Sequence, residues 1–246
     1  MDNKKNEAEA VLMRRIERRF GKGVREYGLI EEGDVILIGL SGGKDSLALL
    51  ELLARRTKIH KPAIRVVAAH VVMRNIPYQS DVEYLRHFSE ERGVPFILSE
   101  TEFDASTDMR KSPCFLCSWN RRKALFSVAK EQGCNKIALG HHMDDILQTL
   151  LMNITFQGAF STMPPKLVMK KFDMTLIRPL CLVHEKDLEE LSDCHQYHKQ
   201  VKHCPYEQQS HRSSMKEVLA QLEAMNPEAR YSLWSSMSNV QEDLLP

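Results

Sequence analysis

The chain has 246 residues, of which 43% are hydrophobic and 27% are charged, and its formal net charge is +1 at pH 7. This length and apolar content suffice for one large α/β domain or for one domain with appendages. The near-neutral charge excludes overall basicity as an argument for nucleic-acid binding, and no apolar run is long enough to cross a bilayer.

The start of the chain and its cysteines indicate the compartment. The segment Met1-Asp2-Asn3-Lys4-Lys5-Asn6 has no apolar stretch after its lysines, so we expect no signal peptide, no membrane partner and a cytoplasmic location. Cytoplasmic thiols stay reduced. The six cysteines therefore indicate metal binding or catalysis rather than disulfides.

Helices and strands alternate along the first part of the chain. In order, we expect an amphipathic helix over 7–27, a strand over 34–39, a helix to about Arg56, and a strand over 64–71. There follow a helix opened by a capping box at Ser80–Glu83 and ended by Gly93, a strand over 95–98, a helix from Cys114 to about Gln132, a strand over 136–140, and a helix from about Asp144 to Phe156.

Beyond Gly158 the pattern is less regular. We expect a loop over 163–166, a short strand over 176–180, a helix over 186–192, and one or two helices over 212–237. The alternation of strands and helices predicts a doubly wound parallel sheet with helices on both faces. We therefore divide the chain into an N-terminal helix (1–30), an α/β domain (31–180) and a mostly helical C-terminal extension (181–246).

The segment Ser41-Gly42-Gly43-Lys44-Asp45-Ser46 joins the strand at 34–39 to the next helix. A glycine-rich turn at this place directs backbone N–H groups and the positive end of the helix dipole at one point, which suits phosphate. It is not a Walker loop, because Ile38 stands five positions before Gly43 and Asp45 follows Lys44. The alternative is a glycine turn with no ligand. Gly21-Lys22-Gly23 is not a dinucleotide fingerprint, because it follows a helix and lacks the third glycine.

The pattern Ser-Gly-Gly-x-Asp-Ser resembles the PP-loop of the ATP pyrophosphatases. The resemblance implies a fold of the adenine nucleotide α-hydrolase type and cleavage of ATP between its α and β phosphates, with transfer of AMP to a substrate oxygen. It also implies that Ser41–Ser46 hold the phosphates and that adenine lies against Ala69 and His70 through main-chain contacts.

A second motif, Gly140-His141-His142-Met143-Asp144-Asp145, follows another predicted strand. Ligands of open α/β sheets collect at the carboxyl ends of the strands, so we expect this motif beside the first loop. Its carboxylates suit Mg²⁺ on a triphosphate, whereas the alternative is that Asp144 caps a helix and the histidines pack. PP-loop proteins carry a similar Gly-His-x-x-Asp-Asp segment. Gly42 and Gly43 N–H groups, Lys44 and Mg²⁺ would stabilise the leaving pyrophosphate.

Pro113-Cys114-Phe115-Leu116-Cys117 opens a predicted helix, so its two thiols share one helical face. Cys134 and Cys181 border buried strands and are expected to pack, whereas Cys194 and Cys204 lie in a histidine-rich segment. Four interpretations of the first pair remain open. They are an unreactive pair, a redox pair, a structural zinc site with Cys204 and a histidine, and an iron–sulfur cluster on three cysteines with one iron open.

Several segments resemble the tRNA 2-thiocytidine biosynthesis (TtcA) family. They are Pro113-Cys-x-x-Cys, Arg121-Arg122, 136–150, Met163-Pro164-Pro165-Lys166, Ile177-Arg178-Pro179-Leu180 and Glu185-Lys186-Asp187. The resemblance implies a [4Fe-4S] cluster held by Cys114, Cys117 and Cys204. The family commonly has a second Cys-x-x-Cys at the later site, whereas Cys204-Pro205-Tyr206-Glu207 ends in glutamate here.

The resemblance implies ATP-dependent thiolation of a tRNA cytidine at position 32, in which adenylation of the 2-oxygen makes AMP the leaving group. Its catalytic residues would be Lys44, Asp45, Asp144 and Asp145, with Arg121 either holding phosphate or serving as a surface charge. A sulfur donor such as a cysteine desulfurase would be a partner, and a homodimer stays open. The alternatives are a PP-loop amide or amine ligase without a cluster, and a non-catalytic nucleotide- or metal-binding regulator.

Basic residues form local clusters that permit an RNA partner without requiring one. These clusters are Arg14, Arg15, Arg18 and Arg19; Arg55, Arg56, Lys58 and Lys61; Arg121, Arg122 and Lys123; and Lys166, Lys170 and Lys171. Each can equally be a solvated helix face.

Overall fold

The computed structural model describes residues 2–76, 80–104, 113–170, 172–198 and 211–244, with the side chains of 2–5 and 211–213 left out. The chain divides into two compact units that interleave in sequence. The first comprises Met1–His142 and Pro165–Glu207, and the second comprises Met143–Pro164 and Gln208–Pro246. No helix among the described residues is both long and apolar enough to cross a membrane.

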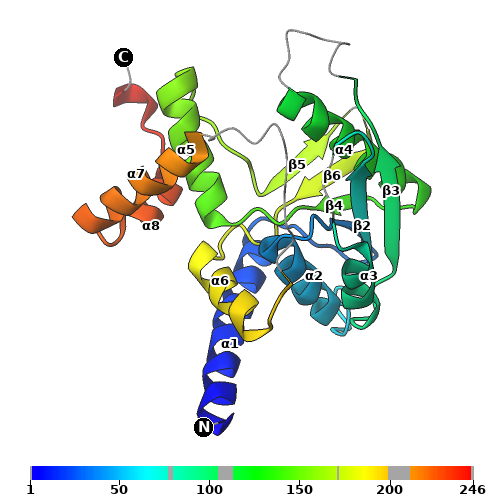
Figure 1. Cartoon of the computed structure of the whole chain (residues 1–246). Helices are drawn as coiled ribbons and strands as arrows, with labels where there is room; N and C mark the ends of the chain where they lie inside the picture. Colours follow the sequence, from blue (N-terminus) through cyan, green and yellow to red (C-terminus); the bar gives the residue numbers. More distant parts are fainter. Residues whose placement is uncertain (1, 77–79, 105–112, 171, 199–210, 245–246) are drawn as a thin grey trace. The chain divides into compact units, whose positions relative to one another are not determined.

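The first unit is built on a six-stranded sheet in the order β3-β2-β1-β4-β6-β5 (Figure 1). The strands are β1 (Val35–Gly39), β2 (Arg65–Met73), β3 (Phe96–Thr101), β4 (Lys136–Ala138), β5 (Lys166–Met169) and β6 (Met174–Ile177). All neighbours pair in parallel except β5 and β6, which are antiparallel. The predicted parallel sheet is confirmed, with one added edge strand, β5, that the sequence pattern did not indicate.

Helices cover both faces of this sheet because alternate residues of a strand point to opposite sides. Ile36 and Ile38 of β1 pack in one core with side chains of α1 (Asp2–Glu26), α2 (Lys44–Arg56), α3 (Val82–Glu90) and α6 (Glu185–Cys194). Leu37, between them, packs on the other face with Val128 and Ala129 of α4 (Pro113–Glu131). The doubly wound arrangement predicted from the sequence is therefore confirmed.

The second unit is helical. It contains α5 (Met143–Gln157), α7 (His211–Met225), α8 (Ala229–Ser236) and a short 3₁₀ turn, η1 (Glu242–Leu244). Met143 and Leu147 of α5 are buried against Leu219 of α7, and Leu233 of α8 packs on the same cluster. The sequence predicted one or two helices over 212–237, and the structure has two there, α7 and α8.

Two local predictions meet different outcomes. The capping box predicted at Ser80 is wrong: Asp81 is the N-cap of α3, and its carboxylate accepts the N–H of Tyr84 at 3.0 Å. Aspartate is as good a cap as serine, and it stands one residue closer to the helix. Gly23, in contrast, lies inside α1, where a Cβ would come within 3.0 Å of Cys181 Sγ. This glycine serves close helix packing, which agrees with the rejection of a dinucleotide fingerprint.

Candidate active site

The topological switch point of the sheet lies between the carboxyl ends of β1 and β4. From β1 the chain proceeds to β2 and β3 on one side, whereas β4 and β6 lie on the other side of β1. The segments that leave β1 and β4 therefore diverge, and such a switch point is where open α/β sheets bind ligands. Ser41–Ser46 follows β1, and Gly140–His142 follows β4.

These two segments are in direct contact. A Cβ on Gly140 would lie 3.1 Å from both the carbonyl carbon of Asp45 and the backbone nitrogen of Ser46. The buried His142 places Nε2 4.0 Å from Asp45 Oδ1. The two segments therefore lie side by side at Gly140 and His142, as expected from the sequence. Position 140 requires glycine because the backbone of Asp45 and Ser46 is so close.

The first loop closes on itself through its serines. Ser41 Oγ and Ser46 Oγ are 3.2 Å apart, and the Ser46 hydroxyl donates to the Gly43 carbonyl at 2.9 Å. Gly42 has a φ of +82°, a left-handed conformation that favours glycine. Gly43 is the N-cap of α2 but offers no side-chain cap, so the positive end of the helix dipole is left for an anion. The Gly43 N–H itself donates to Ser41 Oγ at 3.3 Å in this structure.

Lys44 is held by two carboxylates. Its Nζ lies 3.3 Å from Asp45 Oδ1 and 3.5 Å from Glu185 Oε1, at the start of α6. Burial opposes the charged form, but Asp45 and Glu185 outweigh it and raise the pKa of Lys44. The Lys44 ammonium is thus a permanent positive charge within the loop. Sequence reasoning gave Glu185 no role of its own, because its partner is far away in the chain.

Ala69 and His70, the predicted adenine contacts, also brace the start of the loop. The Leu40 N–H donates to the Ala69 carbonyl at 2.9 Å, and His70 Nδ1 lies 2.7 Å from the Leu40 carbonyl oxygen. His70 Nε2 bonds Ser80 Oγ at 2.8 Å. Burial lowers the pKa of His70, and the nearby Arg121 lowers it further, although the bond to Leu40 opposes both. A neutral imidazole therefore ties β2 to the loop, and Arg121 of α4 lies close enough to act on it.

The paired cysteines lie at the same end of the sheet. Cys114 is exposed and Cys117 is half-buried in the first turn of α4. Cys117 packs against a cluster that contains Met73, the last residue of β2, and Phe103, just beyond β3. Since β1, β2 and β3 are parallel, their carboxyl ends share one edge. The Cys-x-x-Cys pair and the Ser41–Ser46 loop therefore belong to one edge of the first unit.

The donor set fits an iron–sulfur cluster as far as the structure describes it. Cys114 and Cys117 supply two thiolates from one helical turn, which are the ligands such clusters take. Within the described ranges, no three His, Cys, Asp or Glu side chains group as a metal site. The third predicted ligand, Cys204, lies outside the described residues.

The other described cysteines are unsuited to this role. Burial raises the pKa of Cys134, and it raises that of Cys181 to about 12, so both thiols stay protonated. Both side chains are buried in the core of the first unit, as predicted. Cys194 is half-buried and packs against the core that contains Ile36 and Ile38.

Asp144 and Asp145 belong to the second unit, in the first turn of α5. Asp144 is buried and forms an ion pair with Arg230 of α8. Arg230 Nη2 also bonds Glu223 Oε2 at 2.8 Å. Burial opposes the charge on Arg230, but Glu223 and Asp144 outweigh it and raise its pKa. Arg230 is thus the ion-pair partner of Asp144 within the second unit, and no motif in the sequence indicated it.

Comparison with known proteins decides the family. Residues 9–223 match the family model of the PP-loop domain. A tRNA-cytidine(32) 2-sulfurtransferase from Geotalea daltonii is 36% identical over 95% of this chain and 94% of its own length. The chain belongs to the PP-loop family, among the tRNA-cytidine(32) 2-sulfurtransferases.

Further relatives support this assignment. A tRNA-cytidine(32) 2-sulfurtransferase from Acinetobacter baylyi is 32% identical over 93% of this chain and 77% of its own length. Among solved structures, the U34-tRNA thiolase NcsA from Methanococcus maripaludis with its [4Fe-4S] cluster superposes with a TM-score of 0.75 and 25% identity, over 96% of this chain and 81% of that chain. The family resemblance and PP-loop fold predicted from the sequence are confirmed.

Substituting Gly140 is expected to damage the PP-loop directly. In Gly140→Ala the new methyl group meets backbone atoms of Asp45 and Ser46, which cannot rotate away. Overpacking costs roughly 1–3 kcal/mol, so we expect ATP affinity to fall about tenfold, measured by titration calorimetry. The control is Gly21→Ala, where the nearest atom is the flexible Arg25 Nη1 at 3.3 Å. Equal ATP affinity of Gly140→Ala and the wild type would contradict the tight contact.

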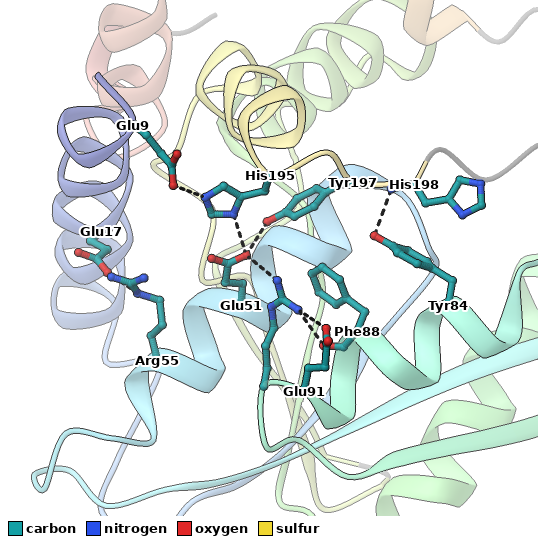
Figure 2. A network of polar contacts seen from close by, with 11 residues as sticks. Glu9, Glu17, Glu51, Arg55, Tyr84, Phe88, Glu91, His195, Tyr197 and His198 are labelled. Atoms are coloured by element: carbon teal, nitrogen blue, oxygen red, sulfur yellow. Dashed lines mark hydrogen bonds and ion pairs between the residues drawn. The ribbon is translucent and has the colours of Figure 1, made fainter. Parts of the chain in front are cut away.

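A buried polar network ties the far end of α6 to α2 (Figure 2). Glu51 of α2 is 7% exposed; its Oε2 accepts from Tyr197 Oη at 2.9 Å and lies 3.1 Å from His195 Nδ1. His195 Nε2 reaches Glu9 Oε1 of α1 at 3.2 Å, and Arg92 Nη2 lies 3.6 Å from Glu51 Oε2. Because Glu185 bonds Lys44 at the other end, α6 is attached to α2 near both of its termini.

This network predicts a pH-dependent stability. The hydrogen bond to Glu51 raises the pKa of His195, although burial opposes this rise. The free energy of unfolding that charged His195 contributes is therefore complete below the ordinary pKa of 6.5, and it is lost as the pH rises through the raised pKa. Burial tends to raise the pKa of Glu51, but His195 outweighs this effect and lowers the pKa. The free energy of unfolding that ionised Glu51 contributes is therefore present above pH 4.5, and it is lost as the pH falls through the lowered pKa.

We therefore expect His195→Gln to lose about 1–3 kcal/mol of unfolding free energy at pH 6 and clearly less at pH 9, measured by urea denaturation. The matched control is His87→Gln, since the His87–Glu91 pair is exposed. A His195→Gln deficit that is equal at the two pH values would show that His195 is not charged in this network.

Proposed function

We propose that this chain is an ATP-dependent tRNA sulfurtransferase. It adenylates the cytidine at position 32 of the tRNA and replaces the 2-oxygen of this base with sulfur. The observation that carries the proposal is the contact of Gly140 with Asp45 and Ser46, which joins the PP-loop to the second motif. The Cys114 and Cys117 pair lies at the same edge of the sheet. Similarity to the 2-sulfurtransferases over nearly the whole chain supports the substrate.

The first step is nucleophilic attack of the cytidine 2-oxygen on the α-phosphorus of ATP. A new P–O bond forms, the bond to the β-phosphate oxygen breaks, and pyrophosphate leaves with the electron pair. Lys44 and the uncapped N-terminus of α2 are positioned to stabilise that negative charge. Asp45 would hold Mg²⁺ on the phosphates, since carboxylate oxygens are the protein ligands this ion prefers. Ser41 and Ser46 offer hydroxyls at the two ends of the loop.

The second step replaces AMP at carbon 2 of the base. A sulfur nucleophile adds to this carbon, the C–O bond breaks, and AMP leaves with the former 2-oxygen. A [4Fe-4S] cluster, when bound by Cys114, Cys117 and Cys204, supplies an iron site that can hold sulfide. Arg121, close to His70, would hold a phosphate at this edge. The sulfur itself would come from a donor of the cysteine desulfurase kind.

The test uses anaerobically purified, full-length protein with ATP, Mg²⁺, sulfide and tRNA from a strain that lacks this gene. We expect 2-thiocytidine by mass analysis of the nucleosides, with about one pyrophosphate released per sulfur installed. Pyrophosphate release with another base product would favour an amide or amine ligase. No tRNA-dependent pyrophosphate release would favour a non-catalytic binder, and either outcome would overturn the proposal.

A further inference from the structure

A groove in the first unit lies between α1, α2 and the segment 57–62 that follows α2. Its volume is about 840 Å³. Phe20 and Val24 of α1 and Leu52 of α2 line it, and all three side chains are more than nine-tenths buried. The groove is thus a built feature with an apolar floor, not a gap between mobile side chains.

The charges around this groove are almost all of one sign. Its lining includes five cationic side chains and a single carboxylate, Glu17, which leaves a formal surplus of four positive charges. The cationic residues are Arg25, Arg55, Arg56, Lys58 and Lys61. Only Arg55 is paired with the carboxylate, at 2.8 Å from Nε to Glu17 Oε1 (Figure 2).

The remaining cations keep donors available. Arg56 Nη2 donates to the Lys61 carbonyl at 3.3 Å, whereas Nη1 is buried and has no hydrogen-bond partner among the described residues. Lys58 and Lys61 are both exposed in the segment that follows α2. An anion in the groove would accept hydrogen bonds from these N–H groups.

In two other basic clusters of the first unit, carboxylates or carbonyl oxygens pair with some of the cations. Arg15 and Arg19 of α1 form ion pairs with Asp187. Lys166 donates to the Gly28 carbonyl at 2.8 Å and lies 3.6 Å from Glu31 Oε1. The local charge surplus of the groove is therefore not a general property of the surface.

We propose that this groove binds phosphates of the tRNA backbone, away from the nucleotide that reacts. The inference rests on the proposed function. A protein with a net charge of +1 gains little from overall attraction to RNA, so its affinity must come from local clusters. The 13 residues of α2 place the groove about 18 Å from the PP-loop, at the opposite end of one rigid helix. Contacts of this kind position the substrate without reading its sequence.

The test compares Lys58→Ala/Lys61→Ala with the charge-preserving Lys58→Arg/Lys61→Arg and with Lys130→Ala, an exposed lysine near the end of α4. We expect the alanine pair to weaken tRNA binding about tenfold at 150 mM salt, and to reduce the slope of log K against log salt by about 2. ATP affinity and thermal unfolding should stay at wild-type values. The arginine pair and Lys130→Ala should bind tRNA normally.

A footprint provides a second readout. Bound tRNA should protect Lys58 and Lys61 of the wild type from acetylation and leave Lys130 reactive. If the wild type thiolates tRNA but the alanine pair binds it with unchanged affinity and salt slope, the groove is not a tRNA site. If the wild type neither binds nor thiolates tRNA, the proposed function itself fails.

Discussion

Asp45→Asn is expected to reduce tRNA-dependent pyrophosphate release by at least about a hundredfold, while the protein stays folded. The carboxylate lies 3.3 Å from Lys44 Nζ and faces the buried His142. Asparagine keeps the shape but removes the charge that helps to raise the pKa of Lys44, and it removes a preferred oxygen ligand for Mg²⁺. Single-turnover measurement of pyrophosphate at saturating ATP and tRNA would show the loss in the chemical step.

The control is Asp193→Asn, which removes an exposed carboxylate near the C-terminus of α6, the end opposite to Glu185. It should release pyrophosphate at the wild-type rate. A wild-type rate in Asp45→Asn as well would mean that the loop at Ser41–Ser46 is not where ATP is cleaved.

Cys114→Ala is expected to abolish sulfur transfer and to leave ATP binding intact. Cys114 is exposed in the first turn of α4, so its removal leaves no cavity in the core. We expect 2-thiocytidine formation to fall below about 1% of wild type, the order expected when an essential group is removed, and the iron content of anaerobically purified protein to fall with it. ATP affinity should change less than about twofold.

Cys194→Ala provides the matched control. Cys194 is half-buried and, like Cys114, belongs to a helix of the first unit, so this variant also removes one helical thiol. It should keep its iron and its thiolation activity. Loss of ATP binding in Cys114→Ala would assign this cysteine a structural role, and one zinc per wild-type chain without iron would exclude the cluster.

Much of the fold could be predicted because its signals are local. The apolar run at Val35–Ile38 and the glycine-rich turn after it specify a strand, a loop and a helix without reference to the rest of the chain. The prediction of a capping box was wrong because the Ser80 hydroxyl bonds the imidazole of His70 in β2 instead of capping α3. The edge strand β5 was missed because two of its four residues are exposed, none is buried, and they carry no clear alternation.

The partners of the site could not be predicted because they are specified by tertiary contacts. Glu185 reaches Lys44, and Arg230 reaches Asp144, across long stretches of chain. A single charged residue on an amphipathic helix has many ordinary uses, so its spacing carries no signal. The PP-loop and the Cys-x-x-Cys pair were visible in the sequence because their chemistry requires fixed spacing between neighbours.

The interleaving of the two units has a consequence for biosynthesis. The helix α5 leaves the ribosome well before α7, the helix that buries its Met143 and Leu147. In between, the chain must produce β5, β6 and α6, which complete the other unit. The apolar stripe of α5 therefore stays exposed on the nascent polypeptide until α7 has been made, and a ribosome that stalls before residue 211 would present a ligand for chaperones.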